Sequence, residues 1–253
     1  MQESCDYTAP GGSVELVKAG AREWGLELTP EQVKAFEVYY QELVTWNKRI
    51  NLTSITDYEE VQVKHFLDSL SCLQVLAGLS PQARCIDIGA GAGLPGLPLK
   101  IARPETRLTL LEATGKKTLF LQHVVRELGL QGVEIINARA EELGHEPAHR
   151  ERYDVALARA VAELSVLLEY ALPLTAVGGI FVAQKGVEIE DEVEAAEAAM
   201  KVLGGQMRGV TAVQLPGLEA ARHLIVVEKV SPTPEKYPRR PGIPAKRPLA
   251  LTS

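Results

Sequence analysis

Apolar positions along the chain change their spacing at about residue 83. Before that point they recur at helical spacing, which predicts amphipathic helices at residues 13–25, 30–48 and 57–77. Thr29 and Gln32 flank Pro30 as a capping box, so the second helix should begin at this proline. The first eighty residues are therefore expected to form a helical cap.

Short apolar runs alternate with amphipathic helices after residue 83, which is typical of βαβ units and a parallel sheet. Seven strands are predicted, at residues 84–88, 106–111, 133–137, 153–158, 179–185, 208–214 and 222–230. The helices between them are predicted at residues 94–103, 115–128, 162–172 and 188–203. No helix separates the last two strands, so they should form an antiparallel hairpin. We expect an α/β fold with a doubly wound seven-stranded sheet, a C-terminal antiparallel hairpin and an N-terminal helical cap.

Composition divides the chain into three expected regions: a helical cap at 1–80, an α/β domain at 81–230 and a Pro-rich arm at 231–253. The arm holds five prolines between Ser231 and Pro244, so it should lie extended without regular structure. The net charge of the chain is −6, but six basic residues oppose one acid from Lys229 to the end. That segment carries +5 and the remainder −11, which suits one anionic partner docked at one place.

Several classes of protein are excluded by what the sequence lacks. No apolar run approaches the roughly 18 residues of a membrane span, and the N-terminus has no secretory pattern, so we expect a cytoplasmic protein that does not bind membranes. The three cysteines, Cys5, Cys72 and Cys85, form no CxxC pair, so neither disulfides nor a metal site are expected. We expect a monomer.

A glycine-rich turn follows the first predicted strand in the segment CIDIGAGAGLPGLPLKI, residues 85–101. Gly89, Gly91 and Gly93 allow torsion angles that other residues disfavour and let backbone amides approach a ligand closely. Glu112 ends the second predicted strand, 23 residues after Gly89. That spacing suits an acid that accepts hydrogen bonds from both hydroxyls of a ribose.

Three interpretations of this turn compete: a dinucleotide site, a site for S-adenosylmethionine and a tight turn without ligand. Gly91, Gly93 and Gly96 match the GxGxxG pattern of a nicotinamide-dependent dehydrogenase. Asp87, however, opens a DxGxGxG run, which is typical of pockets for the aminoacyl end of S-adenosylmethionine. Some eighty helical residues precede the turn, and the chain ends in a hairpin rather than a second mononucleotide half. These features favour a methyltransferase fold.

The backbone at Ala140 and Glu141 follows the third predicted strand and could read an adenine, or it could be an ordinary helix cap. With these residues the chain resembles the RsmG (GidB) family, bacterial methyltransferases that modify nitrogen 7 of guanosine 527 in 16S ribosomal RNA. The resemblance covers nearly the whole chain and rests on the motifs WNKRINLTSITDYEEVQVKHFLDSL, DIGAGAGLPGLPLKI, LLEATGKKTLFL, NARAEEL, YDVALARAVAEL, QKG, RHLIVVEK and KYPRRPGIPAKRPL.

This resemblance implies a Rossmann-like class I methyltransferase fold, S-adenosyl-L-methionine as cofactor, and 16S ribosomal RNA or the small ribosomal subunit as partner. The cofactor contacts it implies are Gly89, Leu94, Glu112, Ala113, Thr114, Ala140, Glu141 and Arg159. The alternatives that remain are the dehydrogenase and a non-catalytic module that recognises RNA with a relic cofactor pocket.

The kinds of atom that the protein could methylate can be narrowed, because the motifs that two other kinds of methylation require are missing from the sequence. Methylation of an exocyclic amine usually employs an [ND]PP[YF] motif after the fourth strand, where this chain reads ARAVAEL with Arg159 at the Asn or Asp position. Methylation of pyrimidine carbon 5 needs a nucleophilic cysteine, and no cysteine lies in a predicted site loop. A ring nitrogen with a lone pair needs neither device. We therefore expect catalysis by positioning without a general base, with Arg159 as the one candidate catalytic residue.

Several basic and aromatic side chains are candidates for contact with RNA. Arg159 ends the fourth strand and could hold the cofactor carboxylate or an RNA phosphate, or could form a surface ion pair. Lys64 and His65 could close the site or meet RNA, although Lys64 and Asp68 could simply pair along one helix. The other candidates are Lys185, Arg222, His223, Tyr237, Arg239 and Arg240.

Overall fold

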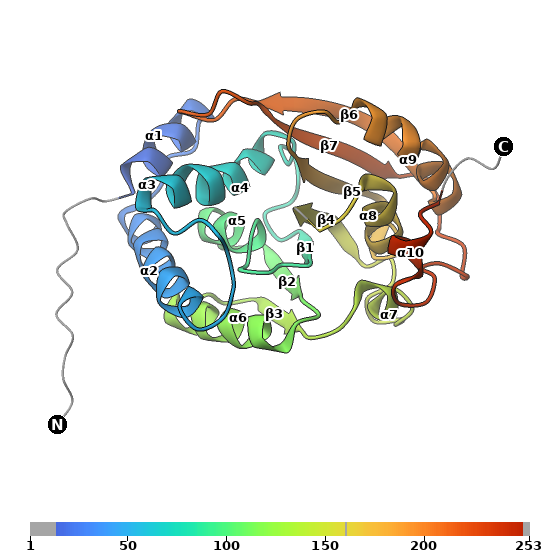
Figure 1. The fold of residues 1–253 in the computed structure, drawn as a ribbon, viewed down its shortest axis with the longest axis horizontal. Helices are drawn as coiled ribbons and strands as arrows, with labels where there is room; N and C mark the ends of the chain where they lie inside the picture. The colour runs from blue at the N-terminus through green and yellow to red at the C-terminus, as the bar shows by residue number, and fades with distance from the viewer. Residues whose placement is uncertain (1–13, 160, 250–253) are drawn as a thin grey trace.

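The computed structural model describes residues 14–159 and 161–249, and they form a seven-stranded sheet with helices on both faces (Figure 1). The strand order is β3-β2-β1-β4-β5-β7-β6. The strands are β1 (Arg84–Ile88), β2 (Arg107–Leu111), β3 (Val133–Ile136), β4 (Tyr153–Arg159), β5 (Thr175–Lys185), β6 (Gly205–Val213) and β7 (Arg222–Lys229). The first five are parallel, whereas β7 runs antiparallel to both β5 and β6. The doubly wound sheet and its terminal hairpin are confirmed.

Helices cover both faces of the sheet. They are α1 (Glu15–Glu23), α2 (Pro30–Asn47), α3 (Tyr58–Val61), α4 (Asp68–Leu70), α5 (Gly96–Ala102), α6 (Gly115–Glu127), α7 (Ala140–Leu143), α8 (Leu164–Ala171), α9 (Glu190–Leu203) and α10 (Ile243–Lys246). Alternate strand residues point to opposite faces, so Leu157 packs with the N-terminal helices, α5 and α6, whereas Ala156 and Ala158 pack with α7, α8 and α9. The strand order reverses between β1 and β4, and ligands of such sheets bind outside the carboxyl ends of strands at that point.

The capping box predicted for α2 is present and also ties the N-terminal helices to the rest of the fold. Thr29 and Gln32 exchange the two expected hydrogen bonds, with Pro30 at the first helical position. The Gln32 amide also donates to the carbonyls of Ile101 and Ala102, at 2.8 and 3.1 Å. The end of α5 is thereby joined to the start of α2, which satisfies carbonyls that have no partner inside their own helix.

The third predicted helix is not uniform. Asp57 caps its start as expected, but residues Gln62–Leu67 form a π-helix between α3 and α4, and a 3₁₀ turn, Ser71–Gln74, ends the segment. A continuous α-helix over 57–77 was therefore the wrong prediction, because apolar spacing does not reveal one wider turn. A π-helix often marks a functional site, since its extra residue changes which side chains face one another.

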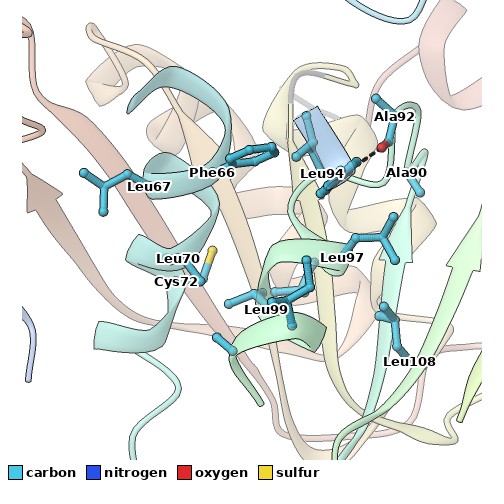
Figure 2. Close-up of a cluster of buried hydrophobic side chains, with 14 of the residues drawn as sticks. Phe66, Leu67, Leu70, Cys72, Ala90, Ala92, Leu94, Leu97, Leu99 and Leu108 are labelled. Carbon is cyan, nitrogen blue, oxygen red and sulfur yellow. Dashed lines mark hydrogen bonds between the residues drawn. The ribbon is translucent and has the colours of Figure 1, made fainter. Parts of the chain in front are cut away.

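The N-terminal helices share one hydrophobic core with the sheet. The Phe66 ring lies 5.1 Å from those of Phe36 and Tyr39, centroid to centroid. Figure 2 shows Phe66 facing the turn that follows β1, and Leu70 and Leu97 belong to the same buried cluster. Burial of this surface supplies most of the attraction between the two parts. The helices therefore do not form a unit with a core of their own.

The C-terminal segment is not the extended arm that its prolines predicted. It contains α10 and packs beside α7 and α8, at the right of Figure 1. Tyr237 is buried, and the Arg239 guanidinium donates to both oxygens of the fully buried Glu169. The Arg150 guanidinium donates to the carbonyls of Thr233 and Tyr237. Prolines prevent long helices but not docking, and a buried carboxylate requires such a partner. Residues 250–253 of the predicted arm lie outside the described residues.

Replacing Arg239 by alanine should lower the free energy of unfolding by about 3 kcal/mol, because the buried Glu169 carboxylate loses its charged partner. Arg240 is exposed, so Arg240→Ala is the matched control and should change stability by less than about 0.5 kcal/mol. Urea unfolding followed by circular dichroism measures both. Equal stability of the two variants would show that the ion pair does not hold the segment in place.

Candidate functional site

The glycine-rich turn between β1 and α5 has the conformation predicted for it. Gly89, Gly91 and Gly93 have φ of +68°, +58° and +90°, a region that favours glycine. A Cβ atom on Gly89 would stand 2.8 Å from a methyl carbon of Val161. The turn therefore lies close against the loop after β4, with no room for a side chain between them.

Hydrogen bonds hold the turn from behind. The amides of Gly89 and Ala90 donate to the Leu111 carbonyl, at 2.8 and 3.0 Å. The hydroxyl of the fully buried Tyr39 donates to the Ala92 carbonyl at 2.5 Å, a bond drawn dashed in Figure 2. Tyr39 belongs to α2, so an N-terminal helix helps to fix the shape of the turn. No sequence pattern indicated this role for Tyr39.

Glu112 bridges the turn and the start of α6. It directly follows β2, and its carboxylate accepts from the Gly91 amide at 2.9 Å and from the Thr114 amide at 2.7 Å. Each carboxylate oxygen can accept a further hydrogen bond, so both remain able to meet a ribose hydroxyl. The contact with a ribose that the spacing between Gly89 and Glu112 suggested stays a prediction.

A cavity of about 180 Å³ opens beside the turn. It brings together four of the predicted cofactor residues, Gly89, Ala113, Ala140 and Glu141. The sequence did not single out the other residues that line it, which are Ile88, Leu111, Ala138, Arg139, Val161 and Tyr170. The cavity lies outside the carboxyl ends of the parallel strands, where this class of sheet binds its ligands.

Six other predicted cofactor residues do not line this cavity: Gly91, Gly93, Leu94, Glu112, Thr114 and Arg159. The Leu94 side chain is part of the hydrophobic core between the turn and the N-terminal helices (Figure 2). Arg159 lines a different cavity, described below. The Glu141 carboxylate, although at the cavity wall, also accepts from the Gly242 amide at 2.9 Å. Glu141 therefore links α7 to the C-terminal segment as well.

Asp87 presents a buried acceptor that needs a partner. Its Oδ2 atom accepts from the Gly96 amide at 2.8 Å, but Oδ1 has no hydrogen-bond partner among the described residues. Burial raises the pKa of the Asp87 carboxyl to about 7. A ligand that brings an ammonium group to this position would satisfy the orphaned oxygen and favour the ionised form of the carboxyl. The aminoacyl end of S-adenosylmethionine fits this requirement.

A second cavity, of about 330 Å³, lies at the ends of β4 and β5 and the start of β7. It brings together five residues that the sequence singled out: Lys64, His65, Arg159, Lys185 and Arg222. His223 does not line it, and its ring nitrogen Nδ1 lies 2.7 Å from the Gly186 carbonyl oxygen. The tail candidates Tyr237, Arg239 and Arg240 are not among its lining residues either.

A buried ion pair joins the N-terminal helices to β4. The Arg159 guanidinium donates to Asp68 Oδ2 at 2.9 Å and to the Lys64 carbonyl at 3.2 Å. The Asp68 side chain is only 7% exposed, so the alternative of a surface ion pair for Arg159 is wrong. The predicted alternative pairing of Lys64 with Asp68 is also wrong, because Lys64 pairs with Glu60 one turn earlier. A π-helix has a wider turn than an α-helix, so residues four positions apart in it do not face one another as they would in an α-helix.

His65 is held neutral and fully bonded. Its Nε2 atom lies 2.7 Å from the Thr53 hydroxyl, and Nδ1 lies 3.0 Å from the Lys64 carbonyl oxygen. A carbonyl can only accept, so Nδ1 carries the proton and Nε2 accepts from Thr53. Burial, reinforced by the nearby Arg159 charge, lowers the pKa of His65 to about 4. His65 therefore stays uncharged near neutral pH, with both nitrogens occupied.

Sequence reasoning missed two side chains of the second cavity, Asp68 as the partner of Arg159 and Gln184. The Gln184 amide donates to the Asp68 carbonyl at 2.7 Å. Gln184 directly precedes Lys185 in the QKG motif, and Asp68 follows Lys64 by four residues. Their positions in these motifs were the only signal, because the contacts join residues more than ninety positions apart.

The described residues contain neither a cluster of metal ligands nor a helix that could span a membrane. Among residues 14–159 and 161–249, no group of three or more His, Cys, Asp or Glu side chains is placed to hold a metal ion. None of the helices in these ranges is both long and apolar enough to cross a membrane. Cys72 and Cys85 are buried thiols, and Cys5 lies outside the described residues.

A family model and two similar proteins carry the same description. A family model described as rRNA small subunit methyltransferase G (GidB) matches residues 32–225. Ribosomal RNA small subunit methyltransferase G of Roseiflexus castenholzii is 55% identical over 229 residues, covering 90% of this chain and 97% of that protein. The protein of the same name from Pelotomaculum thermopropionicum is 50% identical over 235 residues, covering 93% of this chain and 98% of its own.

Solved structures agree on the fold. A mutant of MtNAS in complex with S-adenosylmethionine matches with a TM-score of 0.52 at 16% identity, over 86% of this chain and 78% of that one. A second crystal structure of an MtNAS mutant gives a TM-score of 0.53, also at 16% identity, over 86% of this chain and 76% of that one. The Rossmann-like methyltransferase fold expected from the sequence is thus confirmed. Together with the extent and identity of the sequence matches, this shows that the chain belongs to the ribosomal RNA small subunit methyltransferase G family.

Proposed function

We propose that this protein transfers the methyl group of S-adenosyl-L-methionine to nitrogen 7 of guanosine 527 in 16S ribosomal RNA. Family membership supports methylation of small-subunit RNA, and the resemblance of the motifs supports this atom and position. The observation that carries the proposal is the arrangement of the two cavities at the end of β4. Arg159 lines the second cavity, and Val161 lines the cavity beside the glycine-rich turn. A cofactor and a base could therefore meet across this strand end, in the cytoplasm where ribosomal subunits work.

The residues beside the turn fit the cofactor, which supplies a methyl group on a positively charged sulfur when bound. Glu112 would accept hydrogen bonds from the ribose hydroxyls, and the cavity wall at Ala113 and Ala140 would enclose the adenine. Asp87 would meet the ammonium group, because its buried Oδ1 atom has no partner among the described residues. The Gly89 backbone would contact the remaining part of the cofactor directly, because glycine has no side chain to stand between them.

The second cavity is proposed to hold the target base and to require no general base. Nitrogen 7 of guanine has an unprotonated lone pair, which forms the new bond to the methyl carbon while the electron pair of the carbon–sulfur bond stays on sulfur. No proton moves. The protein need only align the atoms and exclude water. Arg159 is held in place for this by Asp68, while His65 has no nitrogen left to act as a base.

Cationic side chains at this cavity are proposed to bind the phosphates that flank the base. Lys64, Lys185 and Arg222 line it, although Lys185 already donates to Glu192 at 2.5 Å. His223 stands at the start of β7, next to this wall. Of the tail candidates, Arg239 and Tyr237 have internal contacts, whereas Arg240 is exposed and is the one we propose for RNA.

Incubation with labelled S-adenosylmethionine and unmodified small ribosomal subunits tests the proposed function. We expect label at nitrogen 7 of one guanosine, located by mapping the methylated nucleotide. Equilibrium dialysis with NAD serves as the control for a dehydrogenase, which would retain NAD instead. Binding of the cofactor and RNA without methyl transfer would indicate a non-catalytic module.

Gly89→Val should weaken S-adenosylmethionine binding by about 100-fold or more, equivalent to about 3 kcal/mol, because the side chain would enter the space between the turn and Val161. Gly178→Val is the matched control. Gly178 also has a positive φ, +86°, but a Cβ there meets no atom within 4 Å. Isothermal titration of the folded variants measures the affinities. A similar loss in both would mean that backbone strain, not the pocket, causes the effect.

Affinity for S-adenosylmethionine should fall as the pH is lowered through about 7, because the Asp87 carboxyl of the free protein takes up a proton near that pH. A cationic ammonium group prefers the ionised carboxylate, so the dissociation constant should rise by up to about tenfold for each pH unit below 7. Asp87→Asn should flatten this dependence. Titrations between pH 5.5 and 7.5 measure it, and a flat wild-type profile would contradict the assignment of Asp87.

Methyl transfer itself should be nearly independent of pH between about 6.5 and 8.5, the range in which an unperturbed catalytic histidine would titrate. The pKa of His65, about 4, lies well below this range. Single-turnover rates at saturating cofactor and RNA measure the chemical step. His65→Ala should leave the shape of the profile unchanged. A bell-shaped wild-type profile that becomes flat in His65→Ala would overturn catalysis by positioning.

A further inference from the structure

We propose that Asp68 and Gln184 select guanine by accepting hydrogen bonds from its two adjacent N–H groups. The inference rests on the proposed function, in which the second cavity holds the base. It adds the residues that distinguish guanine from the other bases. Both side chains line this cavity, and each residue is only 5% exposed.

Each of these side chains has one oxygen that lacks a hydrogen-bond partner among the described residues. They are Asp68 Oδ1 and Gln184 Oε1. The other polar atom of each side chain is engaged, since Asp68 Oδ2 accepts from Arg159 and the Gln184 amide nitrogen donates to the Asp68 carbonyl. Both side chains are therefore held in place while one acceptor on each stays unsatisfied. Buried acceptors are rarely left so, which indicates that a ligand completes them.

None of the other described side chains that line the cavity donates a hydrogen bond to these oxygens. Lys64, Lys185 and Arg159 are engaged with Glu60, Glu192 and Asp68. His65 uses both ring nitrogens elsewhere. The Arg222 Nε atom forms a long ion pair with Asp68 Oδ1 at 3.9 Å, which is beyond hydrogen-bond distance. A ligand that brings two donors of its own would therefore complete both oxygens.

Guanine is the base that brings two donors side by side. Its ring N1–H and its amino group on carbon 2 are adjacent on one edge, whereas each of the other three RNA bases sets its donors next to acceptors. This edge lies across the ring system from nitrogen 7, so binding it leaves that nitrogen exposed for methylation. The match between two orphaned acceptors, on residues that line one cavity, and two adjacent donors carries the assignment.

The charge of the product assigns each donor to its acceptor. Methylation at nitrogen 7 places a positive charge on the purine and makes N1–H more acidic. A hydrogen bond from N1–H to a carboxylate therefore strengthens as the methyl group is transferred, and stabilises the transition state more than the bound substrate. Asp68 is the carboxylate among the lining residues, so it is assigned to N1–H. Gln184 Oε1 then accepts from the amino group.

Inosine tests the assignment, because it keeps nitrogen 7, the carbonyl and N1–H of guanosine but lacks the amino group. We would measure kcat/KM on small subunits reconstituted with guanosine or inosine at the target position. Wild-type protein should prefer guanosine by tenfold or more. Gln184→Met should reduce the preference below threefold, chiefly by slowing guanosine. Asp68→Asn should slow both substrates and keep the preference, because both retain N1–H.

Gln131→Met is the matched control, since Gln131 is exposed and lies far from the cavity, and it should behave as wild type. If the wild-type protein prefers guanosine over inosine by less than threefold, the inference is overturned. This outcome needs no variant, so the inference can be tested even if the variants fail to fold. A full preference retained by folded Gln184→Met would also overturn it. In both cases guanosine is still methylated and the proposed function stands. Absence of methylation on guanosine subunits would instead remove the proposed function and this inference with it.

Discussion

The ion pair between Arg159 and Asp68 is the contact on which the second cavity depends. It joins the end of β4 to the π-helical region of the N-terminal helices, and both side chains are largely withdrawn from water. Desolvation alone would disfavour either charge, and burial raises the pKa of Asp68 despite the guanidinium beside it. Loss of one partner would leave the other charged and buried, which typically costs about 3 to 5 kcal/mol. The ion pair therefore fixes the end of β4 relative to the N-terminal helices.

The same N-terminal helices also shape the glycine-rich turn. Tyr39 supports the turn through the Ala92 carbonyl, and its ring stacks on Phe66, two residues before Asp68. One packed cluster thus reaches both cavities. Any shift of this cluster would be felt by the turn and by Arg159 together, because packed interiors transmit displacement. The helices that precede the sheet are in this sense part of the site rather than a cover laid over it.

The features that could be predicted from the sequence are those that depend on the pattern of residues close together in the chain. Strand β1, the glycine torsions and the position of Glu112 all follow from spacing within about thirty residues. The partner of Arg159 does not, since Asp68 lies 91 residues away. Lys64 has two acids at a distance of four residues, Glu60 and Asp68, and it pairs with Glu60. The π-helix changed that choice, and apolar periodicity does not detect one additional residue in a turn.

Charge counting misjudged the C-terminal segment for a similar reason. Its excess of basic residues suggested an anionic partner, but Lys229 is fully buried and pairs with Glu151 at 3.1 Å, while Arg239 pairs with Glu169. Both cations are neutralised inside the fold and add nothing to attraction at a distance. The exposed basic residues that remain are Lys236, Arg240, Lys246 and Arg247. Because the segment is docked, these four stand at fixed places on its surface, so any RNA contact there would be set by geometry as well as by charge.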